Sequence, residues 1–238
     1  MGKGLLSPAE ELREIVGSLK HLMMADREWG LEPPALSPSA LGYLENGPES
    51  LRSLEELRDL IGDCRRCKLW RGRTHLVFGE GSPQARLVFV GEGPGREEDL
   101  EGRPFVGEAG KLLTRIIEDG MRMKRQDVYI CNVVKCRPPN NRDPEADEIA
   151  ACIPFLRKQL SLIRPQVVCT LGRIAAQGLL GRDFKITQER GKWLSFADIP
   201  LMSTFHPAYL LRNPSAKRQV WEDVQEIMKH LGLEVKGH

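Results

Sequence analysis

Short apolar runs alternate with helical patterns from Leu54 onward, and this alternation constrains the fold more than any other feature. Four runs are rich in strand-forming residues and bounded by turn residues, at 87–90, 128–131, 167–171 and 201–204. Helical spacing of apolar residues covers 107–119, 144–163, 173–180 and 215–231, and Asp143 can cap the second of these helices, with Pro144 at its first position. Strands that alternate with helices predict an α/β fold, with a parallel sheet covered on both faces.

Three polar side chains stand at the predicted carboxyl ends of these strands, where parallel sheets place their sites. Glu92 and His206 follow the first and last runs, and Asn132 ends the second. A carboxylate there can orient or deprotonate water, and a carboxamide can read the polar edge of a base. Taken singly, each has a plainer explanation: a solvated turn, a structural histidine or a turn cap. Their position at one end of the sheet favours the functional interpretation.

The loop after the first run is rich in glycine and acid, with Gly-Glu-Gly-Pro-Gly at 91–95 followed by Arg-Glu-Glu-Asp at 96–99. It matches neither the dinucleotide-binding pattern nor a Walker loop, and its carboxylates would repel a nucleotide phosphate. Glu97 fits a solvated acidic turn better than a site. Phe105 lies between turn residues, where it can be either a core residue or a stacking surface.

Four cysteines form two pairs that can share a metal centre. Cys64 and Cys67 make a C-x2-C turn, whereas fifteen residues separate Cys136 from Cys152, which lies on the predicted helix 144–163. Zinc suits four thiolates equally well, but structural zinc sites usually pair two tight turns, and iron–sulfur clusters tolerate wider spacing. The spacing therefore leans towards iron–sulfur without deciding between the metals.

Composition indicates the compartment in which the cysteines act. Hydrophobic residues make up 41% of the chain, no apolar run approaches the roughly 18 residues that span a bilayer, and the start has no signal-peptide core. We therefore predict a cytoplasmic protein without a membrane partner, in which cysteines are metal ligands or buried thiols rather than disulfides. Cys131 and Cys169, inside predicted strands, are expected to be buried thiols. A net charge of +2 means that any DNA binding relies on a local basic surface.

Residues 1–52 differ in character from the rest. Ser7 can cap a helix that starts at Pro8 and continues with apolar residues at helical spacing through the first 30 residues. Residues 32–50 contain four prolines and two glycines, which predict a mobile linker. We therefore expect an N-terminal helix and linker at 1–52 and one domain at 53–238. The extension could dock on that domain or serve a repair or replication partner.

Four motifs, in order, resemble those of the family 4 uracil-DNA glycosylases: residues 91–95, 102–107, 132–139 and 206–211. With the two cysteine pairs, the resemblance covers about Leu57 to Leu231. It implies a three-layer α/β/α fold with a central, mostly parallel four-stranded sheet, beside the N-terminal helical extension. It also implies a [4Fe–4S] cluster. The implied ligands are Cys64, Cys67, Cys136 and Cys152.

The resemblance further implies hydrolysis of the N-glycosidic bond of uracil flipped out of single- or double-stranded DNA, the first step of base excision repair. Phe105 would stack on uracil, and Asn132 would bond its Watson–Crick edge. His206 would stabilise the charge on the departing base, and Glu92 would position the attacking water.

Further residues complete the expected substrate site. Gly91 and Gly93 would let the backbone approach uracil, and Glu98 is the candidate that excludes the methyl group of thymine. Leu210 or Leu211 would fill the gap left by the flipped base. We also expect the protein to act as a monomer. The residues expected to contact DNA are Arg190, Lys192, Leu210, Leu211 and Arg212.

Two alternatives from other classes stay open. One related branch captures uracil-DNA covalently through a histidine in a basic loop, but residues 190–193 are short and lack histidine. The other is a non-catalytic iron–sulfur DNA-binding module, which would not need a glutamate, a phenylalanine, an asparagine and a histidine at strand ends. In the glycosylase, the cluster is expected to brace loops rather than to perform redox chemistry, since hydrolysis moves no electron.

Overall fold

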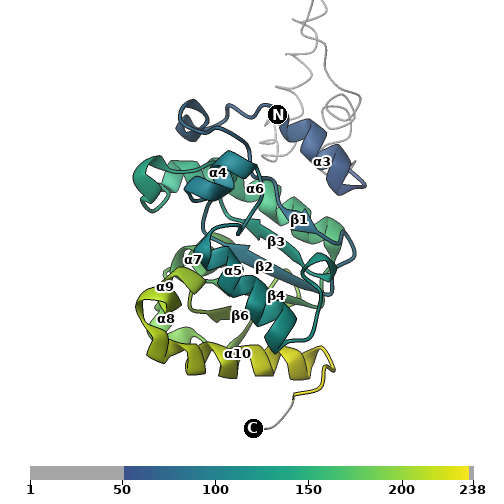
Figure 1. Cartoon of the computed structure of the whole chain (residues 1–238). Coiled ribbons are helices and arrows are strands. Elements are labelled where there is room, and N and C mark those ends of the chain that lie inside the picture. The colour runs from purple at the N-terminus through teal and green to yellow at the C-terminus, as the bar shows by residue number, and fades with distance from the viewer. Residues whose placement is uncertain (1–50, 236–238) are drawn as a thin grey trace, which may run out of the picture. The chain divides into compact units, whose positions relative to one another are not determined.

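A computed structural model describes residues 51–235 (Figure 1). The chain divides into two units between Leu60 and Ile61, and the described part of the first is residues 51–60, which include most of helix α3 (Leu54–Ile61). The predicted N-terminal helix and the linker 32–50 lie outside the described residues, so the domain boundary after residue 52 stays a prediction. Within residues 51–235, no helix is long and apolar enough to span a membrane.

The second unit is built on one sheet in the order β1-β3-β2-β4-β6-β5. Its four central strands are mutually parallel and confirm the predicted fold class. They are β2 (Leu87–Gly91), β3 (Tyr129–Asn132), β4 (Val167–Leu171) and β6 (Ile199–Thr204). All residues of β2 and β4 are buried, which explains why these strands are continuous apolar runs without polar alternation.

Two antiparallel edge strands extend the expected four-stranded sheet to six. β1 (Glu80–Gly81) is only two residues long and pairs with β3, and β5 (Trp193–Phe196) pairs with β6 as a hairpin. The hairpin turns at Ala197 and Asp198, whose φ angles are +47° and +64°. Such a turn favours asparagine, aspartate or glycine at both positions, so Asp198 suits it and Ala197 does not.

Helices cover both faces of the sheet (Figure 1). On one face, α5 (Glu108–Arg115) continues into a π-helical turn (Ile116–Gly120) and packs with α10 (Lys217–His230) over Phe89 and Cys169. The opposite strand residues face α7 (Arg173–Leu180) and its neighbour α6 (Ala146–Ile163). The remaining helices are α4 (Arg96–Glu101), α8 (Ile186–Glu189) and α9 (Pro207–Arg212), with 3-10 turns at Lys68–Arg71, Arg125–Asp127, Pro139–Asn141 and Pro214–Ala216.

Helix α6 begins two residues later than predicted, and the predicted cap was wrong. Its N-cap is Glu145, whose backbone N–H donates to Glu148 Oε2 at 2.8 Å in a reciprocal capping box. The Asp143 carboxylate instead accepts a hydrogen bond from Arg173 Nη2 at 2.6 Å. Glu148 lies three residues after Glu145 and reaches back to its N–H. This bond makes Glu145 the cap, although aspartate, as at Asp143, is intrinsically the better capping residue.

The strand order positions the candidate site. After β2 the chain adds β3 on one side, and later adds β4 and β6 on the other, so the loops that leave β2 and β4 diverge. Gly91 and Asn132 are paired at the carboxyl ends of β2 and β3, and Leu171 and Thr204 are paired at those of β4 and β6. A crevice is expected at this edge of a parallel sheet.

Candidate active site

A pocket of about 450 Å³ opens at this edge. It contains most of the residues predicted to act on uracil: Glu92, Gly93, Glu98, Phe105, Asn132 and His206. They come from the loops after β2, β3 and β6 and from the turn before α5. The structure therefore brings together side chains that are more than a hundred positions apart in the chain.

Asn132 lies at the floor of the pocket, 1% exposed. Its Oδ1 is the one buried side-chain polar atom without a hydrogen-bond partner in the described part of the chain. A Cβ atom on Gly91 would lie 2.6 Å from Phe105 Cζ and closer still to Asn132 Oδ1. Only glycine fits between these two side chains, which gives the predicted residue Gly91 its place beneath the pocket.

Phe105 is 6% exposed and belongs both to the core and to the pocket wall, so it is a core residue, and its role as a stacking surface stays a prediction. Its φ of +54° is uncommon for a bulky residue and needs support from its surroundings. Glu98 provides that support, because its Oε1 accepts hydrogen bonds from the N–H groups of Val106 at 2.9 Å and Gly107 at 3.0 Å. Its Oε2 accepts from Gly95 N–H at 3.0 Å. Glu98 thus joins the two loops of the pocket.

His206 is the N-cap of α9, where its Nδ1 accepts a hydrogen bond from Ala208 N–H at 3.1 Å. An accepting Nδ1 leaves the proton of the neutral ring on Nε2. Burial, with Arg212 adding repulsion, lowers the pKa of His206 to about 4. Its ring centroid lies 5.5 Å from that of Phe105. His206 is therefore a neutral donor beside the Phe105 ring at physiological pH.

Glu92 combines burial with a charged neighbourhood. Burial and the nearby Asp143 together raise its pKa to about 7, against an opposing effect of Arg173. Asp143 and Arg173 form an exposed ion pair at 2.6 Å. A carboxyl group with a pKa near neutrality in a cleft is suited to handling water or a proton.

The predicted wedge residues differ in exposure. Leu210 is 1% exposed and packs in the core, so its predicted contact with DNA was wrong, because α9 turns that side chain inward. Leu211 is 44% exposed. Arg212 lines the pocket together with Tyr209, which is 38% exposed and stacks on Phe205 with ring centroids 4.8 Å apart. Of the two leucines, Leu211 is the one that stays a predicted DNA contact.

The two basic residues of the loop before β5 also differ. Arg190 donates to both carboxylate oxygens of the buried Asp223, at 2.5 and 2.9 Å, and Thr204 donates to the same carboxylate. The Arg190 guanidinium is therefore bonded within the protein and is a poor candidate for a phosphate contact. Lys192 is exposed.

The two cysteine pairs lie close to each other. Arg73 Nη1 donates to Cys64 O at 2.8 Å and to Cys136 Sγ at 3.1 Å, so one guanidinium bridges the pairs. Burial raises the pKa of Cys152 to about 11, and Cys136 and Cys64 contribute to that shift. Cys131 and Cys169 are buried elsewhere as free thiols, as predicted.

The donor set tests which metal centre the cysteines fit. In residues 51–235, no three His, Cys, Asp or Glu side chains come together closely enough for a single metal ion. The four thiols nevertheless influence one another electrostatically, the Arg73 guanidinium donates to Cys136 Sγ, and the backbone N–H of Lys135 donates to Cys152 Sγ at 3.3 Å. Neighbouring thiols that do not converge on one ion, with a guanidinium bonded to one of them, fit an anionic multi-metal cluster better than a single ion.

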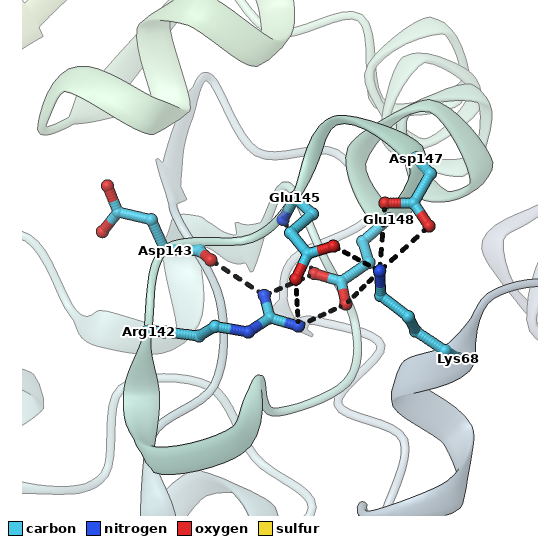
Figure 2. A network of polar contacts seen from close by, with 6 residues as sticks. All are labelled: Lys68, Arg142, Asp143, Glu145, Asp147 and Glu148. Atoms are coloured by element: carbon cyan, nitrogen blue, oxygen red, sulfur yellow. Dashed lines mark hydrogen bonds and ion pairs between the residues drawn. The ribbon is translucent and has the colours of Figure 1, made fainter.

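A network of ion pairs that sequence reasoning missed joins the first cysteine pair to helix α6 (Figure 2). Lys68, next to Cys67, bonds Glu145 and also Asp147 at 3.2 Å. On the other side, Arg142 of the pocket wall makes two bonds to the fully buried Glu148, at 2.7 and 2.8 Å. The acidic start of α6 beside a C-x2-C-Lys turn was the available signal. The network links the cysteine loop to the pocket wall.

The comparisons with known proteins agree on one family. The family model described as Uracil DNA glycosylase superfamily matches residues 78–225. The chain is 48% identical over 183 residues to the type-4 uracil-DNA glycosylase of Sulfurisphaera tokodaii, covering 74% of this chain and 83% of the relative. It is 49% identical over 183 residues to that of Thermotoga maritima, covering 72% and 93%. A type-5 uracil-DNA glycosylase of Pyrobaculum aerophilum is 29% identical over 192 residues, covering 74% and 84%.

Proposed function

Because the chain belongs to the uracil DNA glycosylase superfamily, among its type-4 members, we propose that it hydrolyses the N-glycosidic bond of uracil in DNA at the pocket beside Asn132. One observation carries the assignment of the pocket: the buried, unpartnered Asn132 Oδ1 at its floor. Leaving such an acceptor unpaired is costly, so a ligand that donates to it is expected.

Uracil supplies the missing donor. Its N3–H would donate to Asn132 Oδ1, whereas cytosine presents an acceptor at that position and would leave two acceptors facing each other. Phe105 would stack on the base, above the backbone of Gly91 and Gly93. Glu98, on the wall of the same pocket, remains the predicted barrier to the methyl group of thymine.

Cleavage develops negative charge on uracil and positive charge on the sugar. The Nε2–H of neutral His206 would donate to the uracil oxygen as that charge forms, in the manner of an oxyanion hole. Glu92, as a carboxylate, would hold the attacking water and stabilise the sugar cation. Leu211 would fill the place of the flipped base, and Arg212 and Lys192 would contact phosphates.

A [4Fe–4S] cluster on Cys64, Cys67, Cys136 and Cys152 is the second part of the proposal. The coupled thiols, the bridging Arg73 and the buried Lys135 support it. The cluster would supply a rigid anionic anchor for the loops. We expect purified protein to contain about four irons per chain with a broad visible absorption band. A colourless protein that contains zinc instead would contradict this assignment.

Release of base from a single-stranded oligonucleotide with one uracil tests the function. We expect free uracil with many turnovers from a protein that acts as a monomer. A denaturation-resistant adduct would indicate covalent capture instead, and binding without release would indicate a non-catalytic module. The same oligonucleotide with thymine is the matched control, and we expect it to remain intact.

A further inference from the structure

Lys135 is the least expected buried side chain of the described residues. It is 1% exposed, although lysine is almost never fully buried unless it is paired. Its Nζ donates to Asn132 O at 2.9 Å and to Gln159 Oε1 at 2.6 Å, and neither acceptor is a carboxylate. A desolvated amine placed on two neutral acceptors needs an explanation beyond charge pairing.

The acceptor on helix α6 is itself held in place. Gln159 is fully buried, and its Nε2 donates to Phe78 O at 2.9 Å and to Tyr129 Oη at 3.1 Å. These two bonds determine which end of the amide faces Lys135. The Nζ of Lys135 therefore has little freedom to move away from Asn132 O.

The backbone of Lys135 points to the cysteines. Its N–H donates to Cys152 Sγ at 3.3 Å, its carbonyl accepts from Val77 N–H at 2.8 Å, and the next residue is Cys136. One residue thus contacts a proposed cluster ligand through its backbone and the end of β3 through its side chain.

Asn132 needs external support, because its Oδ1 has no partner inside the protein and cannot orient the side chain by its own bond. Its backbone is held by pairing with Gly91 and by the bond from Lys135 Nζ, and these contacts set the position from which the side chain extends. We propose that Lys135 is a positioning residue, through which the cysteine site holds Asn132 ready to read uracil. This inference rests on the proposed role of Asn132 in uracil recognition.

The first experiment replaces Lys135 by methionine, which has similar length and no donor, with the exposed Lys229→Met on α10 as the matched control. We measure iron per chain, the visible spectrum, thermal unfolding, and kcat and KM for uracil release. Lys135→Met should fold and keep its iron, and kcat/KM should fall by about 10- to 100-fold. Lys229→Met should match the original protein in every measurement.

A double-mutant cycle distinguishes positioning from general structural support. If Lys135 acts through Asn132, then Lys135→Met combined with Asn132→Ala should be no slower than Asn132→Ala alone. A binding measurement without catalysis adds a second readout. Fluorescence anisotropy with an oligonucleotide carrying 2′-fluoro-2′-deoxyuridine, against one with thymidine, should show that Lys135→Met loses preference for uracil.

Additive losses in the double variant, or full activity of Lys135→Met, would overturn the proposal. If Lys135→Met does not fold or loses its iron, the double-mutant cycle with Asn132→Ala is repeated with Gln159→Leu. This variant removes the second acceptor of Lys135 Nζ and contacts no cysteine. Additivity there would overturn the proposal as well. If the unmodified protein releases no uracil, the proposed function fails instead, which the release assay reveals before any variant is made.

Discussion

Replacement of His206 by alanine is expected to lower kcat for uracil release by about 100- to 1,000-fold, the usual effect of removing one oxyanion-hole donor. The Nδ1 of His206 is occupied by Ala208 N–H at 3.1 Å, so only Nε2 can face a substrate. Burial lowers the pKa of the ring to about 4, so the donor is neutral imidazole and its charge does not change near neutral pH. Single-turnover kinetics with excess enzyme measure the step directly.

The N-cap role of His206 allows a sharper control. Asparagine is also a good N-cap, so His206→Asn should retain the bond from Ala208 N–H while losing the reach of Nε2. We expect His206→Asn to be about as slow as His206→Ala. The alanine variant alone should lose about 0.5 to 2 kcal/mol of unfolding free energy. If His206→Asn kept full activity, His206 would be a structural cap and not the donor.

The central strands and the edge that carries the site were predictable because buried parallel strands leave an unmistakable apolar pattern. Glu92, Asn132 and His206 follow such runs, and topology alone brings their loops together. The edge strands were missed because a two-residue strand has no pattern, and the turn before β6 has alanine at position 197, where asparagine or glycine would have indicated a hairpin.

The contacts that each side chain makes were harder to predict than the place of each residue in the fold. The motif contains Leu210 and Leu211 side by side, and only the orientation of α9 decides that the first is buried and the second is 44% exposed. Similarly, Arg190 lies in a basic loop and looked available for a phosphate contact. Its guanidinium instead donates to the carboxylate of Asp223 on α10. Such pairings between distant residues leave no local trace in the sequence.

Glu92 should control the acidic side of the pH profile. The working form is the carboxylate, and burial raises the pKa of Glu92 to about 7, so protonation removes it as pH falls through that value. We expect kcat to decline below about pH 7, approaching a tenfold loss per pH unit. His206 stays neutral throughout this range, because its pKa is about 4, and so it cannot cause the decline.

Replacement of Glu92 by glutamine should lower kcat by about 100- to 1,000-fold and leave a residual rate that is flat between about pH 5 and 8. The exposed Glu97→Gln in the same pocket is the matched control and should change kcat little. In protein that retains Glu92, the neighbouring ion pair predicts two opposite shifts in the midpoint of the acidic side of the pH profile. Asp143→Asn removes a negative neighbour and should move it to lower pH, whereas Arg173→Met removes a positive one and should move it to higher pH. If the acid limb persisted unchanged in Glu92→Gln, another group would be responsible for it, and Glu92 would lose its assigned role.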